Sequence, residues 1–198
     1  AKLATALDSY VIRGVDHNVP FLRACLSHPR FLSGEINTDF IKDEFPQGFE
    51  GLTLDTESQH NLAACLAAIH CWKEMLAHAD PQNVEGMTLM VSLDGSSIEV
   101  TVAATDIEHY NLADGFSVAV AVNGLPKHIC SMSAGSDTIQ RCILVPVDDI
   151  LHDLRDAAAE KEHVVQIHES PFAGAGGGEW QVQYMGAYVS VKVGSPRG

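Results

Sequence analysis

A run of small residues near the C-terminal end of this 198-residue chain is the first candidate for ligand chemistry. It reads Gly174-Ala175-Gly176-Gly177-Gly178. Glycine-rich loops cradle phosphates when a strand precedes them and a helix N-terminus follows. Here the residues that follow have the alternation of a strand, so we interpret the run as a hairpin tip and not as a phosphate site.

The ten histidines are the second candidate, because imidazole is a common metal ligand. His60, His70 and His78 lie on one predicted helix, ten and eight residues apart. A helix presents two ligands to one ion at shorter spacings, one turn apart. We therefore expect structural or surface roles for these three histidines.

An acidic cluster, Asp148-Asp149 with His152 and Asp153, could clamp a cation through ligands four residues apart. The same pattern is typical of the exposed start of a helix, where the helix dipole favours carboxylates. No Gly-x-Ser-x-Gly motif and no nucleophile with a matching base stands out. The sequence thus predicts no catalytic, cofactor-binding or metal-ligating residue.

Charge and composition exclude several functions. Only 12 Lys and Arg stand against 26 Asp and Glu, a net charge of −14, so a basic surface for nucleic acid is not expected. No run of apolar residues approaches the roughly 18 that a membrane helix needs, so no membrane partner is expected.

The sequence starts with neither Met nor a signal sequence, which suggests a piece of a longer protein. The five cysteines are scattered, as is typical of reduced, buried thiols.

The chain divides into two segments with different charge. Residues 1–45 carry a net −1 and residues 46–198 a net −13. The first segment has short apolar stripes at helical spacing and stops at Phe45-Pro46-Gln47-Gly48. About 45 residues of this kind bury too little to fold alone, so we interpret them as a remnant of a larger domain.

A long helix is predicted to open the second segment. Thr56-Glu57-Ser58-Gln59 matches a capping box, and Pro81 ends the pattern, so the helix runs from about 57 to 79. Its middle turns, Leu62 to Leu76, lack a strongly charged face. A helix that is apolar nearly all round belongs inside a protein.

Strands with period-two alternation follow from residue 87 to residue 193. Asp94-Gly95 and Asn123-Gly124 are strong hairpin signals, and Met185-Gly186 joins the last two strands. About eight short strands suggest a sandwich or a barrel, and only a sheet wrapped around the apolar helix accommodates both. The predicted fold is α+β: a long central helix surrounded by a roughly eight-stranded antiparallel β-barrel. A charged helical excursion, Asp148 to Glu162, interrupts the strands.

Two stretches carry a family resemblance. Residues 6–22 (ALDSYVIRGVDHNVPFL), continuing through 28–31, 34–41 and 45–49 (FPQGF), resemble the end of the biotin carboxylase domain in α subunits of biotin-dependent acyl-CoA carboxylases, the propionyl-CoA carboxylases above all. The long helix and the strands ending in residues 182–191 (VQYMGAYVSV) resemble the next domain of that family, which bridges the α and β subunits. The resemblance therefore implies a biotin carboxylase remnant at 1–48 and a bridging domain at 49–198.

The resemblance also implies a function for the whole protein. The parent enzyme would use ATP, Mg or Mn, and bicarbonate to carboxylate biotin, and would pass the carboxyl group to propionyl-CoA on a carboxyltransferase β subunit. None of the six lysines lies between two Met, so no biotin acceptor is expected in this chain, and no cofactor is expected to bind here. The chain is expected to be inactive alone. Its location would be the mitochondrial matrix in a eukaryote and the cytoplasm in a bacterium.

The expected partners are the β subunit and the biotin carboxylase and biotin carrier domains of the same chain. In the family, a hook between the long helix and the first strand grips the β subunit. That hook is short here, and it places the predicted contact on Asp80, Pro81, Gln82, Asn83, Val84 and Glu85. Two alternatives stay open: the α subunit of a methylcrotonyl-CoA or other acyl-CoA carboxylase, and a free-standing small-molecule-binding barrel.

Overall fold

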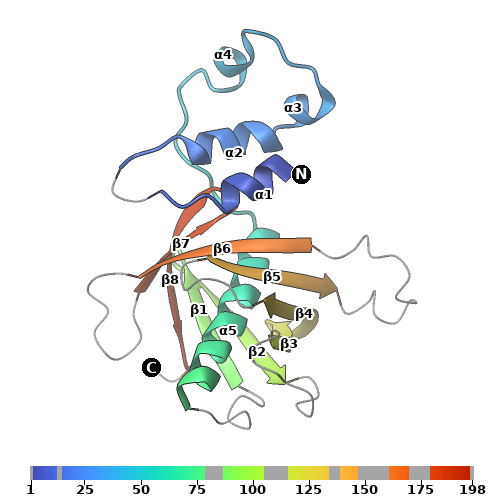
Figure 1. Ribbon diagram of the computed structural model, residues 1–198, viewed down its shortest axis with the longest axis vertical. Coiled ribbons are helices and arrows are strands. Elements are labelled where there is room, and N and C mark those ends of the chain that lie inside the picture. Colours follow the sequence, from blue (N-terminus) through green and yellow to red (C-terminus); the bar gives the residue numbers. More distant parts are fainter. Residues whose placement is uncertain are drawn as a thin grey trace.

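The computed structural model describes residues 2–12, 15–78, 87–104, 116–133, 139–146, 161–169 and 179–196. Helices α1 to α4 form a group at one end of the molecule, and the long helix α5 lies among the strands (Figure 1). The elements are α1 (Lys2–Asp8), α2 (Val19–Ser27), α3 (Pro29–Ser33), α4 (Phe40–Glu44), α5 (Thr56–His78), β1 (Met87–Leu93), β2 (Ser96–Ala104), β3 (Phe116–Val122), β4 (Leu125–Ser133), β5 (Ile139–Pro146), β6 (Lys161–Glu169), β7 (Glu179–Tyr184) and β8 (Ala187–Gly194).

The strands form one antiparallel sheet in which each strand pairs with the next along the chain. The first strand also pairs with the last, with Leu93 of β1 opposite Val191 of β8, so the strand order closes on itself. The predicted α+β class with a curled antiparallel sheet is confirmed.

Three tight turns connect neighbouring strands where the sequence predicted hairpins. Asp94-Gly95, Asn123-Gly124 and Met185-Gly186 all have positive φ at both residues, for example 50° and 83° at Met185 and Gly186. This geometry belongs to type I′ turns, whose twist matches that of the flanking strands. The predicted hairpins are confirmed.

The start of α5 differs from the predicted capping box. The side chain of Asp55, not Thr56, accepts a hydrogen bond from the Ser58 amide at 2.8 Å. The Gln59 side chain donates to the Leu54 carbonyl at 3.1 Å and does not accept from a backbone N–H. Asp55 is therefore the N-cap, because its carboxylate reaches the third amide of the helix.

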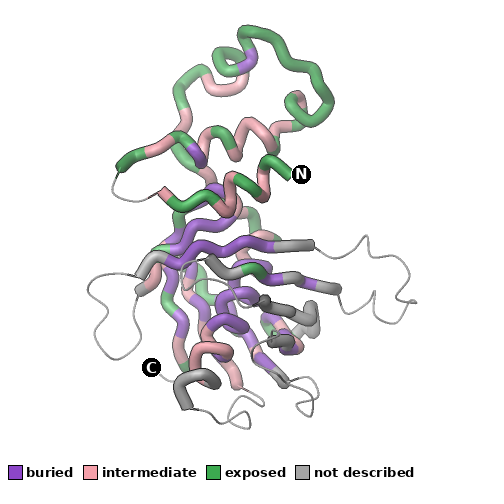
Figure 2. Tube along the Cα trace, viewed as in Figure 1, coloured by how far each residue is buried: buried purple, intermediate pink, exposed green. Residues whose placement is uncertain are grey.

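The core lies between α5 and the sheet. Eight consecutive residues of α5, 62–69, have no exposed surface, so that part of the helix is covered on every side. The helix contacts β1 to β6 and β8. Its large residues Leu62, Leu66 and Ile69 pack with strand side chains such as Val100 and Val182, and each such burial stabilises the fold by about 1.5–3 kcal/mol. Figure 2 shows this continuous buried region.

The helical segment α1 to α4 has a smaller apolar cluster and a more exposed surface (Figure 2). Phe45 contacts the rings of Phe21 and Phe49 with centroids 5.2 Å and 6.2 Å away, and Phe40 is buried beside them. Several large apolar side chains remain exposed, Leu32 by 71% and Leu3 by 60%. No helix among the described residues is both long and apolar enough to cross a membrane.

One predicted element is partly wrong. The charged excursion from Asp148 to Glu162 was expected to be helical throughout, but Lys161 and Glu162 belong to strand β6, where they pair with Leu144 and Ile143 of β5. Residues 147–160 lie outside the described residues.

Candidate functional site

The residues singled out from sequence lie mostly outside the part of the chain that the structure describes. This holds for the predicted β-subunit contact at Asp80, Pro81, Gln82, Asn83, Val84 and Glu85, for the acidic cluster at 148–153 and for the glycine run at 174–178.

All three helical histidines lie on α5, His78 as its last residue. His60 is half-buried, and the His70 ring lies 6.3 Å from the ring of Trp180 on β7. Burial lowers the pKa of His70, with a smaller contribution in the same direction from Lys73 and an opposing one from Glu74. Within the described ranges, no three His, Cys, Asp or Glu side chains gather as a metal site would require.

The strongest constellation of polar contacts joins the helical segment to the sheet. We call it the joint and define it by Asp8, Arg23, Leu52, Gln166 and Gly186. The joint includes a hydrogen bond between residues 158 positions apart in the sequence. It lies where α1 approaches β6 (Figure 1).

Gln166 of β6 is the sheet's polar contribution to the joint. Its side chain has no exposed surface, and its Nε2 donates to the backbone carbonyl of Asp8 at 2.6 Å and to that of Tyr10 at 3.3 Å. The last carbonyls of a helix have no partner within the helix. Gln166 supplies that partner for α1 from the opposite end of the chain.

Arg23 of α2 ties the two helices at the joint together. Its Nε lies 3.1 Å from both carboxylate oxygens of Asp8, and both side chains are close to 90% buried. The pKa of Asp8 is nevertheless raised, because the cost of burying its charge exceeds the attraction and hydrogen bond from Arg23. The ion pair therefore fixes geometry more than it adds stability.

Gly186 closes the joint from the β7–β8 turn. Its φ is +83°, and a Cβ at this position would lie 2.8 Å from Cβ and Cγ of Arg23 and 2.9 Å from Cδ1 of Leu52. Real Cβ atoms do not approach that closely, so only glycine permits this contact as well as this backbone conformation. The turn packs directly onto α2.

Two exposed hydrogen bonds flank the joint. Arg141 of β5 donates to the Ser9 hydroxyl at 3.3 Å, and the Tyr188 hydroxyl of β8 lies 2.9 Å from Nε2 of His17. The helical segment thus meets β5, β6, β8 and the β7–β8 turn.

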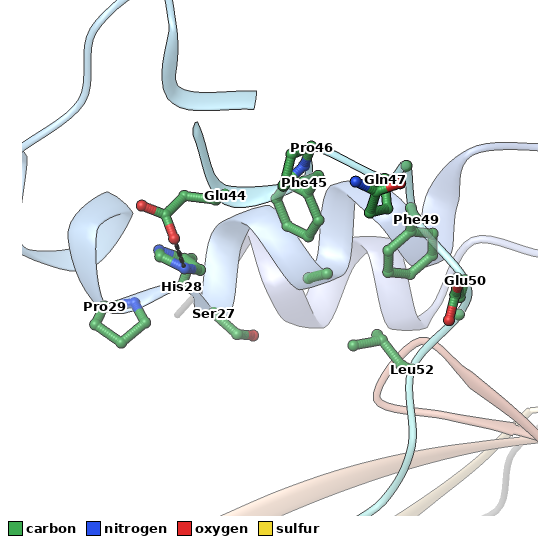
Figure 3. A pocket seen from close by; sticks show the side chains of 13 residues that line it. Ser27, His28, Pro29, Glu44, Phe45, Pro46, Gln47, Phe49, Glu50 and Leu52 are labelled. Atoms are coloured by element: carbon green, nitrogen blue, oxygen red, sulfur yellow. Dashed lines mark ion pairs between the residues drawn. The ribbon is translucent and has the colours of Figure 1, made fainter. Parts of the chain in front are cut away.

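A cleft of about 630 Å³ lies beside the joint (Figure 3). His28 and Glu44 form its far edge, with His28 Nε2 3.2 Å from the Glu44 carboxylate. Arg30 donates to the same carboxylate at 2.5 Å, and this hydrogen bond, aided by the charges of His28 and Arg30, holds the pKa of Glu44 below its usual value. The walls are lined by Ala24, Ser27, His28, Pro29, Glu44, Phe45, Pro46, Gln47, Gly48, Phe49, Glu50, Gly51 and Leu52.

A buried polar pair lies within the sheet. Nδ1 of His163 on β6 is hydrogen-bonded to the hydroxyl of Tyr184 on β7, and the rings are stacked at 19°. Both side chains are nearly fully buried, and burial raises the pKa of Tyr184, with further contributions from Cys65 and Cys142. These groups satisfy one another inside the core.

The arrangement supports a role in holding the two segments together. The Nε of Arg23 donates to the Asp8 carboxylate, and the Nε2 of Gln166 donates to two main-chain carbonyls. A site that positions a reacting substrate would direct such groups into an open cavity. The joint makes one packed unit from two segments with different surface charge.

Sequence reasoning missed the joint. The Met185-Gly186 turn was identified as a hairpin, but its contact with Arg23 has no local signal. Gln166 carried one signal: it interrupts the apolar run Val164-Val165-Gln166-Ile167. A polar residue at this position faces away from the core of the sheet. It would be exposed to water unless another part of the protein covers that face.

Comparisons with known proteins agree with the resemblance. Residues 1–43 match the family described as biotin carboxylase C-terminal domain. The propionyl-CoA carboxylase alpha chain of Ruegeria pomeroyi is 36% identical over 128 residues, which cover 61% of this chain and 19% of the relative. The mitochondrial propionyl-CoA carboxylase alpha chain of Mus musculus is 31% identical over 132 residues, covering 66% of this chain and 18% of the relative.

The similarity also extends across both segments. The propionyl-CoA carboxylase alpha chain of Caenorhabditis elegans is 28% identical over 200 residues, 97% of this chain and 25% of the relative. The chain is similar to propionyl-CoA carboxylase alpha chains, and it spans a quarter or less of the length of these relatives.

Proposed function

We propose that this chain is the non-catalytic, subunit-bridging part of a propionyl-CoA carboxylase α subunit. Residues 1–48 would form the end of the biotin carboxylase domain, and residues 49–198 the bridging domain. The full-length enzyme would carboxylate biotin with ATP and bicarbonate and deliver the carboxyl group to propionyl-CoA on a carboxyltransferase β subunit. The names of the relatives support the reaction, and the mitochondrial relative in mouse supports a matrix location in a eukaryote.

The joint is the observation that carries this proposal. A segment matching the biotin carboxylase C-terminal domain is anchored through Gln166 and Gly186 to a separate sheet-and-helix body. A bridge needs this property, because it must transmit the position of one domain to another. Exposed apolar side chains on the helical segment, Leu3, Leu32 and Ile41 among them, provide a surface for the rest of the biotin carboxylase domain.

The proposal places no ATP or biotin site in this chain. No lysine stands between two methionines, and the Asp8 carboxylate, the Arg23 Nε and the Gln166 Nε2 are engaged in internal contacts. We therefore assign no catalytic step to this chain. Its contribution is to hold the tethered biotin carrier, the carboxylase domain and the β subunit within one assembly, which sets their effective concentrations.

The alternative of a free-standing ligand-binding barrel has less support. Such a carrier needs a hollow interior, but Leu62, Leu66 and Ile69 of α5 have no exposed surface and pack into the strand core. The methylcrotonyl-CoA enzyme has the same architecture in the family resemblance, and the named relatives favour the propionyl-CoA enzyme.

The test uses the full-length α subunit co-expressed with its β subunit. Residues 80–85, the predicted partner contact, are replaced by a Gly-Ser linker of the same length. We expect weaker co-purification of the β subunit and a nearly unchanged melting temperature, because surface loops tolerate such replacement. Co-purification equal to wild type would place the contact elsewhere, and no co-purification with the wild-type α subunit would refute the bridging function itself.

A further inference from the structure

We propose that Gln166 and Gly186 are positioning residues that set the orientation of the biotin carboxylase domain relative to the bridging domain. This inference rests on the proposed function and concerns a property of the joint that the comparisons do not address. The two residues touch no substrate. They act through the helices that they hold.

The contact at Gln166 fixes the end of α1. One amide nitrogen donates to two carbonyls two residues apart, those of Asp8 and Tyr10. Its complete burial keeps water from competing for the Gln166 amide itself. A shift or rotation of α1 along the sheet would therefore break a hydrogen bond with no replacement at hand.

The contact at Gly186 fixes α2 independently. The turn backbone lies against Cβ and Cγ of Arg23, atoms close to the helix axis, and against Leu52 in the connection to α5. Contacts to the base of a side chain leave little freedom, because Cβ moves only with the helix and Cγ moves otherwise only by a change of the χ1 rotamer. A rotation about the Gln166 contact would drive α2 into the turn or away from it.

The ion pair between Asp8 and Arg23 makes the two contacts act on one unit. Asp8 provides a carbonyl to Gln166 and a carboxylate to Arg23, and Arg23 provides the surface on which Gly186 rests. The joint thus has two anchor points on two linked helices. Two anchor points define an orientation where one would allow a swivel.

Orientation matters because a biotin carrier must reach two separate active sites. Misplacing one domain changes the effective concentration of the carrier at that domain's site while leaving the chemistry at each site intact. Loss of the joint should therefore lower the coupled reaction and spare the partial reaction. A purely structural role would lower both together.

The experiment compares three alanine substitutions in the full-length α subunit assembled with its β subunit. Gly186→Ala introduces the clash at the joint. Gly95→Ala and Gly124→Ala are matched controls, since these turn glycines have similar φ, +87° and +75°, but open space where the Cβ would lie. All three variants place alanine at a similar positive φ, and only Gly186→Ala disturbs the joint.

Two rates are measured for each variant: ATP-dependent carboxylation of free biotin, and overall carboxylation of propionyl-CoA. We expect Gly186→Ala to lower the ratio of overall to partial rate by about tenfold, through kcat and not through the KM for propionyl-CoA, and the controls to stay within about twofold. Gln166→Met should lower the ratio in the same direction, with the exposed Gln181→Met as its control.

Two outcomes would overturn the inference. One is an unchanged ratio in both Gly186→Ala and Gln166→Met. The other is a parallel fall of both rates, which would indicate general loss of structure. Co-purification of the β subunit is recorded for every variant, so failure of the bridging function is seen separately from failure of positioning. If Gly186→Ala does not fold, Gln166→Met decides the question.

Discussion

Gln166 on β6 and Gln183 on β7 are directly paired across neighbouring antiparallel strands, and each leaves one buried amide atom without a hydrogen-bond partner in the described structure. The atoms are complementary: Oε1 of Gln166 accepts, and Nε2 of Gln183 donates. Opposed residues on one face have Cβ atoms about 5 Å apart. The two unpaired atoms, an acceptor and a donor on neighbouring strands, are thus not hydrogen-bonded to each other.

We predict different stability effects for the two glutamines. Gln166→Met removes the donor from two main-chain carbonyls and should lower the free energy of unfolding by about 1–3 kcal/mol. Gln183→Met removes an unpaired donor and should change it by less than about 1 kcal/mol. Urea unfolding of the chain measures both. Equal losses would show that Gln166 is not the residue that holds α1.

Placing a charge on the buried face of α5 should unfold the molecule. In Ile69→Asp a carboxylate replaces a side chain with no exposed surface, at a cost of several kcal/mol. Ile41→Asp makes the same substitution at an isoleucine that is 55% exposed and should leave the melt within a few degrees. Thermal unfolding followed by circular dichroism compares them. A cooperative melt of Ile69→Asp near the wild-type temperature would mean that α5 is not enclosed.

The hydroxyl of Tyr184 should contribute more to stability than that of Tyr188. Tyr184→Phe removes the buried group that is hydrogen-bonded to His163 and should cost about 1–3 kcal/mol. Tyr188 is 51% exposed, and its bond to His17 competes with water, so Tyr188→Phe should cost well under 1 kcal/mol. Chemical denaturation of both variants gives the comparison, and a reversed order would contradict it.

The two carboxylates with shifted pKa should have opposite effects on acid stability. The pKa of Glu44 is lowered in the folded state, so its stabilisation is present above the unfolded value near 4.5 and is lost as the pH falls through the lowered value. The pKa of Asp8 is raised, so its contribution is largest below 3.8 and is lost as the pH rises through the raised value.

Melting temperatures between about pH 3 and pH 7 test this difference. Relative to wild type, Glu44→Gln should lose less stability on acidification, and Asp8→Asn should lose more. Glu50→Gln, at an exposed position of the same cleft, is the control and should follow wild type. Identical pH profiles for Glu44→Gln and wild type would show that the contacts of Glu44 with Arg30 and His28 do not persist in solution.

The sequence predicted those parts of the fold that local rules determine. Asp94-Gly95 and Asn123-Gly124 adopt the turns that their residue types favour, and the all-round apolar middle of α5 is buried. The N-cap was displaced by one residue, because Asp55 and Thr56 are both good caps and only the path of the connection decides between them.

The joint could not be predicted, because its contacts depend on the approach of distant segments. Nothing near Gly186 indicates that Arg23 will lie against it, and a Cβ clash exists only once α2 is in place. The end of the charged excursion was misassigned for a related reason: Lys161 and Glu162 have good helix propensity, but pairing with β5 overrides it.

The joint also has an evolutionary consequence. On the α1 side Gln166 contacts only main-chain carbonyls, which every amino acid possesses. Substitutions in α1 that keep the helix in place can therefore accumulate without loss of this hydrogen bonding. On the turn side, the position of Gly186 has no tolerated replacement while α2 stays where it is. We expect relatives that share this joint to vary along α1 except at Asp8, which pairs with Arg23, and to retain glycine at the turn.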